Sequence, residues 1–273
     1  MVHSKLQILL YGEQIGGLDV ALADAQGVEL DEVVRFPNKH YLIIYIDTRE
    51  ALPQTFTIQL KCDGEVVLAV PYELKQRRQE RCASFDASDV VYLLMPDRFA
   101  MGESYRKKRQ MYAGMREDTW NRRKPYARHG GDLRGMMKHL DYLQDLGVTT
   151  IWPTPMLEND MEEQSYHGYA ITNYYETDPR LGTNEDYRTF VDEAHRRGMK
   201  VIMDMVFNHC GTENFLFRDR PADDWFNYDS HYVQTGYKTG VPSDVHASAL
   251  DRRLTVEGCS PVSPARSASV MGT

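Results

Sequence analysis

Short apolar runs dominate the first 75 residues, and each run is rich in Val, Ile, Leu, Tyr, Phe or Thr. Runs of this kind without helical spacing between them are typical of β-strands. Turn-forming residues separate the runs. Five strands are predicted: Lys5–Tyr11, Val33–Phe36, Tyr41–Asp47, Thr55–Lys61 and Glu65–Leu74. We therefore expect residues 1–75 to form a small antiparallel β-sandwich of the immunoglobulin-like kind, followed by a charged linker over residues 76–88.

From residue 89 onward, strands alternate with amphipathic helices. Val90–Met95 is a near-continuous apolar run, as expected for a parallel strand that is buried on both faces. Val148–Trp152 and Lys200–Val206 are predicted as the second and third strands. Between these runs, apolar residues recur at helical spacing, first from Leu133 to Leu146 and then from Tyr187 to Ala194. An order of strand, helix, strand, helix, strand predicts an α/β fold with a parallel sheet.

Both predicted helices have residues that favour defined ends. Asp132 follows a Gly-Gly pair and is a candidate N-cap of the first helix, and Gly147 favours its end. Thr183 and Asp186 have the spacing of a capping box at the start of the second helix, which Gly198 ends. The helices are thus predicted to lie between the three strands.

The loops after the first two strands of this part are long. They comprise Pro96–Gly131 and Pro153–Gly182. Most connections in β/α units are short, and long ones tend to carry function. Because barrel enzymes build their active sites at the carboxyl ends of the strands, the position of these loops indicates an enzyme.

Charge excludes some classes of partner. The 273 residues include 32 basic and 40 acidic side chains, which gives a formal net charge of −8, and the pI is about 5.6. Nucleic acids and anionic membranes require a basic face, so neither is an expected partner. Arg106–Arg109 is a local basic run, for which we predict a solvated loop because no aromatic stacking platform surrounds it.

The sequence predicts neither a membrane-spanning segment nor a zinc site or dense disulfide framework. The longest apolar runs, such as Tyr41–Ile46, are far too short to span a bilayer. The first residues lack the pattern of an export signal, so none is expected, and the compartment stays open. The four cysteines, which lie far apart and form no Cys-x-x-Cys motif, indicate neither a zinc site nor a dense disulfide framework: Cys62, Cys82, Cys210 and Cys259.

Six short segments of the second part have a recognisable order and spacing. They are Met95–Ala100, Gly130–Leu133, Leu146–Trp152, Tyr166–Ala170, Asp178–Thr183 and Asp204–His209. Together they resemble the first three β/α units of the TIM (β/α)8 barrel of the α-amylase family of glycoside hydrolases. The β-rich front part resembles that of the cyclomaltodextrinase, neopullulanase and maltogenic amylase branch. The resemblance implies a partial catalytic barrel over residues 89–257, followed by an irregular tail over 258–273.

The resemblance also implies roles for particular residues. Asp204, Asn208 and His209 match the family's Asp-x-x-x-Asn-His signature, in which the histidine bonds the sugar in the −1 subsite and the aspartate supports the site from behind. The asparagine contributes to a structural calcium site in some members. Tyr169 matches a tyrosine that stacks on the −1 glucose, and His167 matches a histidine that bonds the same sugar. An α-glucan oligosaccharide is the implied substrate.

These roles agree with the chemistry of sugars, although purely structural roles stay open. The CH-bearing face of a sugar is apolar, so an aromatic ring binds it while the hydroxyls reach polar neighbours. The alternative is that the tyrosines pack the loop onto the barrel, and we predict that role for Tyr174 and Tyr175. Asp97 and Arg98 are expected to organise the loop after the first strand.

No cofactor is expected, and calcium is doubtful. Several relatives have Asp and Asn in the loop after Asp-Arg-Phe, which supply the oxygen ligands that calcium prefers. Here the corresponding stretch, Gly102–Arg109, is mostly cationic. Positive charge at this place would repel a divalent cation.

The residues that would perform the hydrolysis are missing from the pattern. Retaining glycosidases use two carboxyl groups about 5–5.5 Å apart. The resemblance would place the nucleophile in a Gly-x-Arg-x-Asp segment after strand four and the acid/base after strand five, and no such segment follows His209. The part from residue 89 onward is also shorter than the roughly 250 residues of a complete barrel. We therefore expect an N-terminal fragment that is inactive alone.

Another function stays open at this point. Because the front domain pairs subunits in this branch, the chain could be a non-catalytic glucan-binding or dimerisation module that forms a homodimer through that domain. The substrate preference among starch, pullulan and cyclodextrins is also left open.

Overall fold

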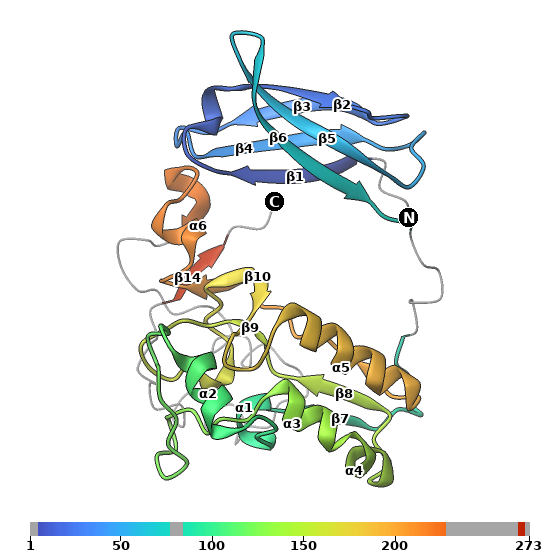
Figure 1. Ribbon diagram of the computed structural model, residues 1–273, viewed down its shortest axis with the longest axis vertical. Coiled ribbons are helices and arrows are strands. Elements are labelled where there is room, and N and C mark those ends of the chain that lie inside the picture. Colours follow the sequence, from blue (N-terminus) through green and yellow to red (C-terminus); the bar gives the residue numbers. More distant parts are fainter. Residues whose placement is uncertain (1–4, 77–83, 228–266, 271–273) are drawn as a thin grey trace, which may run out of the picture. The chain divides into compact units, whose positions relative to one another are not determined.

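The computed structural model describes residues 5–76, 84–227 and 267–270, and the chain divides into two compact units (Figure 1). The first unit contains Met1–Ala83 and Asp219–Trp225. The second contains Ser84–Arg218 and Phe226–Thr273. Within the described ranges, none of the helices has the length and apolar character needed to cross a membrane. The first unit thus includes a short segment from a distant part of the sequence, which the sequence did not predict.

The first unit is a β-sandwich of two antiparallel three-stranded sheets. One sheet has the order β1 (Lys5–Tyr11), β4 (Tyr41–Asp47), β3 (Glu29–Arg35), and the other has the order β2 (Asp19–Ala23), β5 (Gln54–Cys62), β6 (Glu65–Leu74). Both sheets contribute to one core, in which Ile44 and Ile46 of β4 pack with Phe56 and Ile58 of β5. The prediction of an antiparallel sandwich is therefore confirmed.

Alternating side chains explain how β5 joins this core. Phe56, Ile58 and Leu60 are buried at every second position, as expected for a strand with one face inward. Strand β2 was not predicted, because Asp19–Ala23 is short and its two alanines give little β signal.

The second unit contains a parallel sheet of β7 (Val91–Leu94), β8 (Thr150–Pro153) and β11 (Lys200–Val201), with β8 in the middle. This confirms the parallel β/α arrangement. The predicted third strand was too long, because only its first two residues pair with β8, followed by one hydrogen bond from Ile202 N to Ile151 O.

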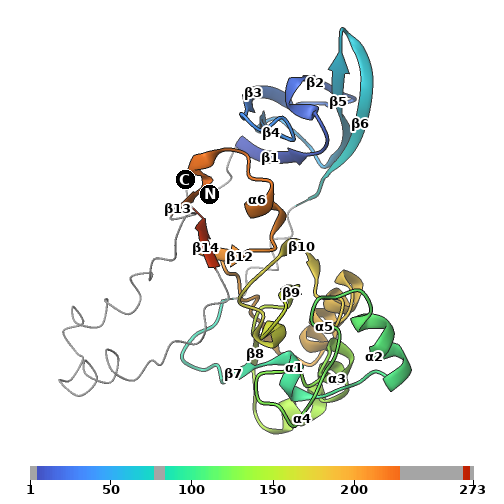
Figure 2. The same ribbon diagram turned by 90° about the vertical axis from the view of Figure 1, so that its left-hand side faces the viewer.

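Three helices cover one face of this sheet: α3 (Leu133–Lys138), α4 (Leu140–Asp145) and α5 (Asn184–Arg196) (Figure 2). Leu94 and Ile151 of the strands are buried in the same core as Phe190 of α5. The other face carries Leu93 and Trp152, which are register partners and are 59% and 38% exposed. Apolar side chains therefore lie on both faces, but only the face toward the helices is buried, so the prediction of burial on both faces was wrong.

The first predicted helix is divided into α3 and α4. His139 separates them with a φ of −116°, outside the helical range, and its Nδ1 lies 2.8 Å from Gly135 O. The predicted caps are confirmed. Asp132 Oδ1 accepts from Gly135 N at 2.7 Å, and Thr183 and Asp186 form the reciprocal capping box of α5.

The basic run does not form the predicted solvated loop. It lies in α2 (Tyr105–Tyr112), whose N-cap Ser104 accepts from Lys107 N. Lys108 is fully buried, and its Nζ donates to Arg180 O at 2.7 Å and lies 3.3 Å from an oxygen of Asp132. The predicted loop is thus a helix, and Lys108 is buried in a polar network, whereas the other three basic residues of the run are exposed as predicted.

The predicted irregular tail is also corrected in part. It contains β14 (Ser267–Val270), which pairs antiparallel with β12 (His209–Gly211) and β13 (Phe226–Asn227). Residues 77–83 of the predicted linker and 228–266 of the barrel and tail lie outside the described residues. The remaining short elements of the described residues are α1 (Pro96–Phe99), β9 (Leu157–Glu158), β10 (Asn173–Thr177), α6 (Phe215–Arg218) and the 3-10 turns Ile15–Gly17, Ser165–His167 and Asp223–Trp225.

Candidate functional site

Tyr169 lies at the centre of a cluster that joins the loop after β8 to the segment after β11. Its phenol donates to Asp204 Oδ2 at 3.0 Å, and Trp152 Nε1 donates to the same oxygen at 3.1 Å. His209 Nε2 lies 3.0 Å from the carbonyl oxygen of Tyr169. The Tyr169 side chain nevertheless stays partly open, since the residue is 37% exposed. The structure thus brings together residues that are up to 57 positions apart, from Trp152 to His209.

His167 approaches the same tyrosine from a 3-10 turn, Ser165–His167. Its Nδ1 accepts from the backbone N–H of Tyr169 at 3.0 Å, and the two rings are 5.8 Å apart. Burial and the nearby Arg128 lower the pKa of His167, which favours the neutral ring. A neutral ring that accepts at Nδ1 carries its proton at Nε2, so His167 offers an N–H donor.

The electrostatics around Tyr169 keep its hydroxyl protonated. Burial and the hydrogen bond to Asp204 raise the pKa of Tyr169 to about 12, because an anionic phenolate beside a carboxylate is disfavoured. The phenol therefore acts as a donor to Asp204, and this bond fixes the ring orientation. Trp152 was not among the predicted site residues, although its place at the carboxyl end of a parallel strand indicates a site position.

Of the five predicted site residues, Asn208 stands apart from the cluster. His167, Tyr169, Asp204 and His209 are joined by the hydrogen bonds described above, whereas Asn208 is exposed. Their roles toward a sugar stay predictions.

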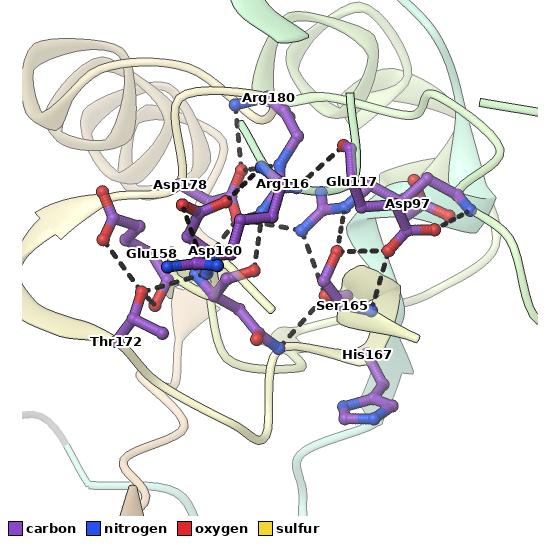
Figure 3. A network of polar contacts seen from close by, with 12 residues as sticks. Asp97, Arg116, Glu117, Glu158, Asp160, Ser165, His167, Thr172, Asp178 and Arg180 are labelled. Atoms are coloured by element: carbon purple, nitrogen blue, oxygen red, sulfur yellow. Dashed lines mark hydrogen bonds and ion pairs between the residues drawn. The ribbon is translucent and has the colours of Figure 1, made fainter. Parts of the chain in front are cut away.

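A buried polar network lies directly behind the turn that carries His167 (Figure 3). Asp178 Oδ2 accepts from Arg128 at 2.9 Å and from Arg180 at 2.7 Å, and all three residues are at most 2% exposed. Burial alone would raise the pKa of Asp178, but the two guanidinium groups outweigh it and lower the pKa to about 2. The carboxylate therefore stays charged and holds both arginines. Nothing in the residue pattern predicted this network.

Asp97 and Arg98 organise the loop after β7, as predicted. Asp97 accepts from the backbone N–H groups of His129 and Gly130 at 2.8 and 3.1 Å. Arg98 donates to the carbonyl groups of residues 125 and 127, and its guanidinium carbon lies 3.9 Å from the centre of the Tyr166 ring. This loop is thereby held against the turn that precedes Tyr169.

The packing prediction holds for only one of the two remaining tyrosines. Tyr174 donates to the carbonyl oxygens of Val206 and His209, each at 3.0 Å, and so packs the loop as predicted. For Tyr175 the prediction was wrong, because the residue is 64% exposed. Neighbouring β-strand residues point to opposite faces, and these two tyrosines follow one another in β10.

The cluster has the chemistry of a site for a polyhydroxylated ligand. The Tyr169 ring supplies an apolar surface, and His167 supplies a donor. When His209 is neutral and donates from Nε2 to the Tyr169 carbonyl, its Nδ1 is an acceptor. Across the ranges that the structure covers, no group of three or more His, Cys, Asp and Glu side chains could hold a metal ion. Cys62 and Cys210 are free thiols.

Comparison with known proteins identifies the family. The model of the α-amylase catalytic domain matches residues 93–251, and that of the cyclomaltodextrinase N-terminal domain matches residues 1–78. The chain is 36% identical to neopullulanase 2 of Thermoactinomyces vulgaris and 37% identical to a cyclomaltodextrinase of Geobacillus thermopakistaniensis. These alignments cover 55% and 54% of the chain, but only 26% and 25% of those proteins.

Among solved structures, an α-amylase from Geobacillus thermoleovorans in complex with acarbose is 35% identical. That match covers 56% of this chain and 31% of the other, with a TM-score of 0.45. The chain thus spans about a quarter of the length of the curated relatives described above. Because the catalytic-domain model matches more than half of its residues, the chain belongs to the α-amylase family of glycoside hydrolases.

Proposed function

We propose that this chain supplies one wall of an α-glucan-binding site, in which Tyr169 stacks on a glucose ring and His167 and His209 bond its hydroxyls. The cluster around Tyr169 carries this proposal, because it combines a partly open aromatic face with a donor and an acceptor. An apolar face flanked by a few fixed polar groups is the usual construction of a small-molecule site. Asp204 has a supporting role, since it orients the tyrosine from behind.

The names of the relatives support a proposal for the substrates. Relatives are named neopullulanase, cyclomaltodextrinase and intracellular maltogenic amylase. We accordingly propose that the ligands are malto-oligosaccharides, cyclodextrins, starch or pullulan, and that the intact reaction is hydrolysis of α-1,4 bonds with retention. Retention requires a nucleophile and an acid/base about 5–5.5 Å apart. Since the sequence contains neither family pattern, we propose that the 273-residue chain binds α-glucans without cleaving them.

Calorimetric titration with maltoheptaose and with β-cyclodextrin tests this proposal. The chain should bind both sugars, and Tyr169→Ala should weaken binding about tenfold, because aromatic contacts are worth roughly 1 kcal/mol beyond the buried area. Tyr175→Ala is the matched control and should bind like the parent, since Tyr175 is largely exposed and lies outside the cluster. A reducing-sugar assay should detect no product. Failure of the parent to bind either sugar would contradict the binding role, and robust product release would contradict the absence of turnover.

A second candidate function is self-association through the first unit. Val66, Val67 and Leu68 at the start of β6 are 46%, 56% and 45% exposed, and β6 is an edge strand. Exposed apolar residues on a sheet edge favour contact with another chain. Sedimentation equilibrium should then show a dimer that Val67→Lys weakens, whereas a monomer at all concentrations would exclude this function.

A further inference from the structure

Two loops meet behind the candidate sugar site, and one of them holds the turn of the other. The turn Ser165–His167 belongs to the loop after β8, whereas Glu117 and Arg128 belong to the loop after β7. We propose that Glu117 and Arg128 are positioning residues that fix this turn, and with it His167 and Tyr169, for binding of the sugar. This inference rests on the proposed function and extends it to residues that do not touch the ligand.

Glu117 and Arg128 hold the turn through hydrogen bonds to Ser165. Glu117 Oε2 accepts from Ser165 N at 3.0 Å and from Ser165 Oγ at 2.6 Å. Arg128 Nε donates to Ser165 Oγ at 2.7 Å, and its Nη2 donates to Ser165 O at 3.0 Å. The hydroxyl, the N–H and the carbonyl of one buried serine are thus all bonded to these two side chains.

The side chains of Glu117 and Arg128 are themselves held in place. Arg128 Nη2 also donates to Asp178, which accepts in turn from Arg180, and the Arg128 backbone N–H donates to Glu117 Oε1 at 3.3 Å. Arg180 Nη1 donates to the carbonyl of Glu117 at 3.0 Å. In Figure 3, His167 extends from Ser165 at one end of this network. Buried side chains with several bonds each have little freedom to move, so they define where the turn lies.

The backbone of the turn explains why it needs such support. Gln164 before the turn has a φ of 55°, and Gly168 after it has a φ of 85°. A non-glycine residue in the left-handed region is strained unless its surroundings hold it. At Gly168, a side chain would come within 2.0 Å of the Pro155 carbonyl oxygen. The turn is therefore closely confined on one side and anchored through Ser165 on the other.

Two hydrogen bonds connect the turn at Ser165 to the groups that are proposed to bind the sugar. His167 follows two residues later, and its Nδ1 accepts from the N–H of Tyr169. The Tyr169 carbonyl in turn lies 3.0 Å from His209 Nε2. A shift of Ser165 would thus move the His167 donor and the Tyr169 ring together. Small displacements of groups that bind or orient a ligand are costly.

Binding measurements on the 273-residue chain provide the first test. Glu117→Ala should weaken maltoheptaose binding about tenfold, whereas Glu117→Gln, which keeps an oxygen acceptor for Ser165, should stay within about threefold of the parent. The matched control is Glu158→Ala. Glu158 is a partly buried carboxylate of the neighbouring strand that accepts from Thr172 and does not contact the turn. The affinity of Glu158→Ala for maltoheptaose should stay within about twofold of the parent.

Titration of His167 by imidazole 15N NMR gives a second readout that needs no sugar. Besides burial, the charge of Arg128 lowers the pKa of His167, and the charge of Glu117 raises it. Glu117→Gln should therefore lower the pKa of His167 further, and Arg128→Met should raise it. A turn that merely came loose would expose the ring and raise this pKa toward its ordinary value in both variants.

The inference is overturned if the parent binds maltoheptaose and Glu117→Ala binds it equally well. It is also overturned if the pKa of His167 rises in Glu117→Gln. Absence of binding by the parent would defeat the proposed function instead, and the two opposite pKa shifts would still decide the positioning role. The Glu117 variants keep the test valid even if Arg128→Met does not fold.

Discussion

At the residue scale, burial distinguishes the thiol chemistry of Cys210 from that of Cys62. Cys210 is 1% exposed, and burial raises the pKa of its thiol to about 12. Cys62 in the first unit is exposed. Because the thiolate is the reactive form, the two cysteines should differ strongly in their reaction with alkylating agents.

We expect iodoacetamide at pH 8 to alkylate Cys62 readily and Cys210 at least about 100-fold more slowly, in line with its small thiolate fraction. Peptide mapping by mass spectrometry distinguishes the two sites in one sample, so each protein molecule serves as its own control. Urea should remove the difference. Equal rates in the native chain would show that Cys210 is accessible.

Asp178 should make the stability of the second unit depend on pH. Its pKa in the folded state is lowered to about 2, which is below the ordinary value of an aspartate. The folded state is therefore stabilised above the pKa of the unfolded state, and this contribution of about 2 kcal/mol is lost as the pH falls from about 4 to about 2. Urea unfolding at several pH values measures the loss.

Asp178→Asn should show a lower stability at pH 7 and a smaller loss below pH 4, because the neutral amide no longer pairs with the two arginines. Asp141→Asn is the control, since the Asp141 side chain is 80% exposed and pairs only at the surface. A parent protein whose stability does not change between pH 4 and pH 2 would contradict the assignment.

At this scale the sequence predicted the residues of the cluster around Tyr169, but not the residues that hold the cluster in place. His167, Tyr169, Asp204 and His209 follow from short motifs, and the structure brings them together. Glu117 and Arg128 could not be predicted, because a single charged residue in a long loop resembles any solvated side chain. Only three-dimensional contact shows that Arg128 is buried against Ser165.

At the scale of elements, caps and turns set where helices begin. The capping box of α5 satisfies backbone donors at both Thr183 and Asp186. Thr183→Ala should lower the free energy of unfolding of the second unit by about 1 kcal/mol, whereas Thr183→Ser should cost only a few tenths, roughly, because it keeps the hydroxyl. Chemical denaturation measures both. An equal loss in the two variants would argue against the cap.

The segment Asp219–Trp225 should depend on one carboxylate for its place in the first unit. Asp219 accepts from Tyr11 at 2.9 Å and from Asn38 at 2.6 Å, and its Oδ2 lies 2.7 Å from His40 Nδ1. Burial would raise the pKa of Asp219, but these hydrogen bonds outweigh it and lower the pKa.

Asp219→Ala should therefore lower the amide protection factors of peptides that cover residues 219–225, and acidification through the lowered pKa should do the same in the parent once the slower intrinsic exchange in acid is divided out. The matched control is Asp223→Ala, because Asp223 lies in the same segment and makes only a surface ion pair with Arg220. Exchange that is unaffected by Asp219→Ala would show that other contacts hold the segment.

Element prediction succeeded where periodicity was strong and failed where tertiary contacts decided. Strands β1, β4 and β6 have the predicted bounds. In contrast, the helix expected from Leu133 to Leu146 is interrupted at His139, and the third parallel strand stops pairing after Val201. A hydrophobic pattern shows which face is buried, but it does not show where the backbone leaves the sheet.

At the scale of the whole chain, the parallel sheet presents a second apolar face. Leu93 and Trp152, which are register partners on this face, are 59% and 38% exposed. Exposed apolar surface of this kind binds hydrophobic dyes. We expect the purified chain to enhance the fluorescence of such a dye, and Leu93→Ser to reduce the signal. Leu52→Ser, at a leucine of the first unit that is 76% exposed, should change it little. Equal effects of both variants would remove the sheet face as the binding surface.

The central claim is that His167, Tyr169 and His209 line the place where an α-glucan binds. The most direct test is an imidazole 15N–1H spectrum recorded with and without saturating maltoheptaose, with the signals assigned by single substitutions. The account predicts that the signals of His167 and His209 shift, while those of His139 and His195, which lie at the helices, stay in place. Unchanged signals of His167 and His209, or equal shifts at all four histidines, would contradict it.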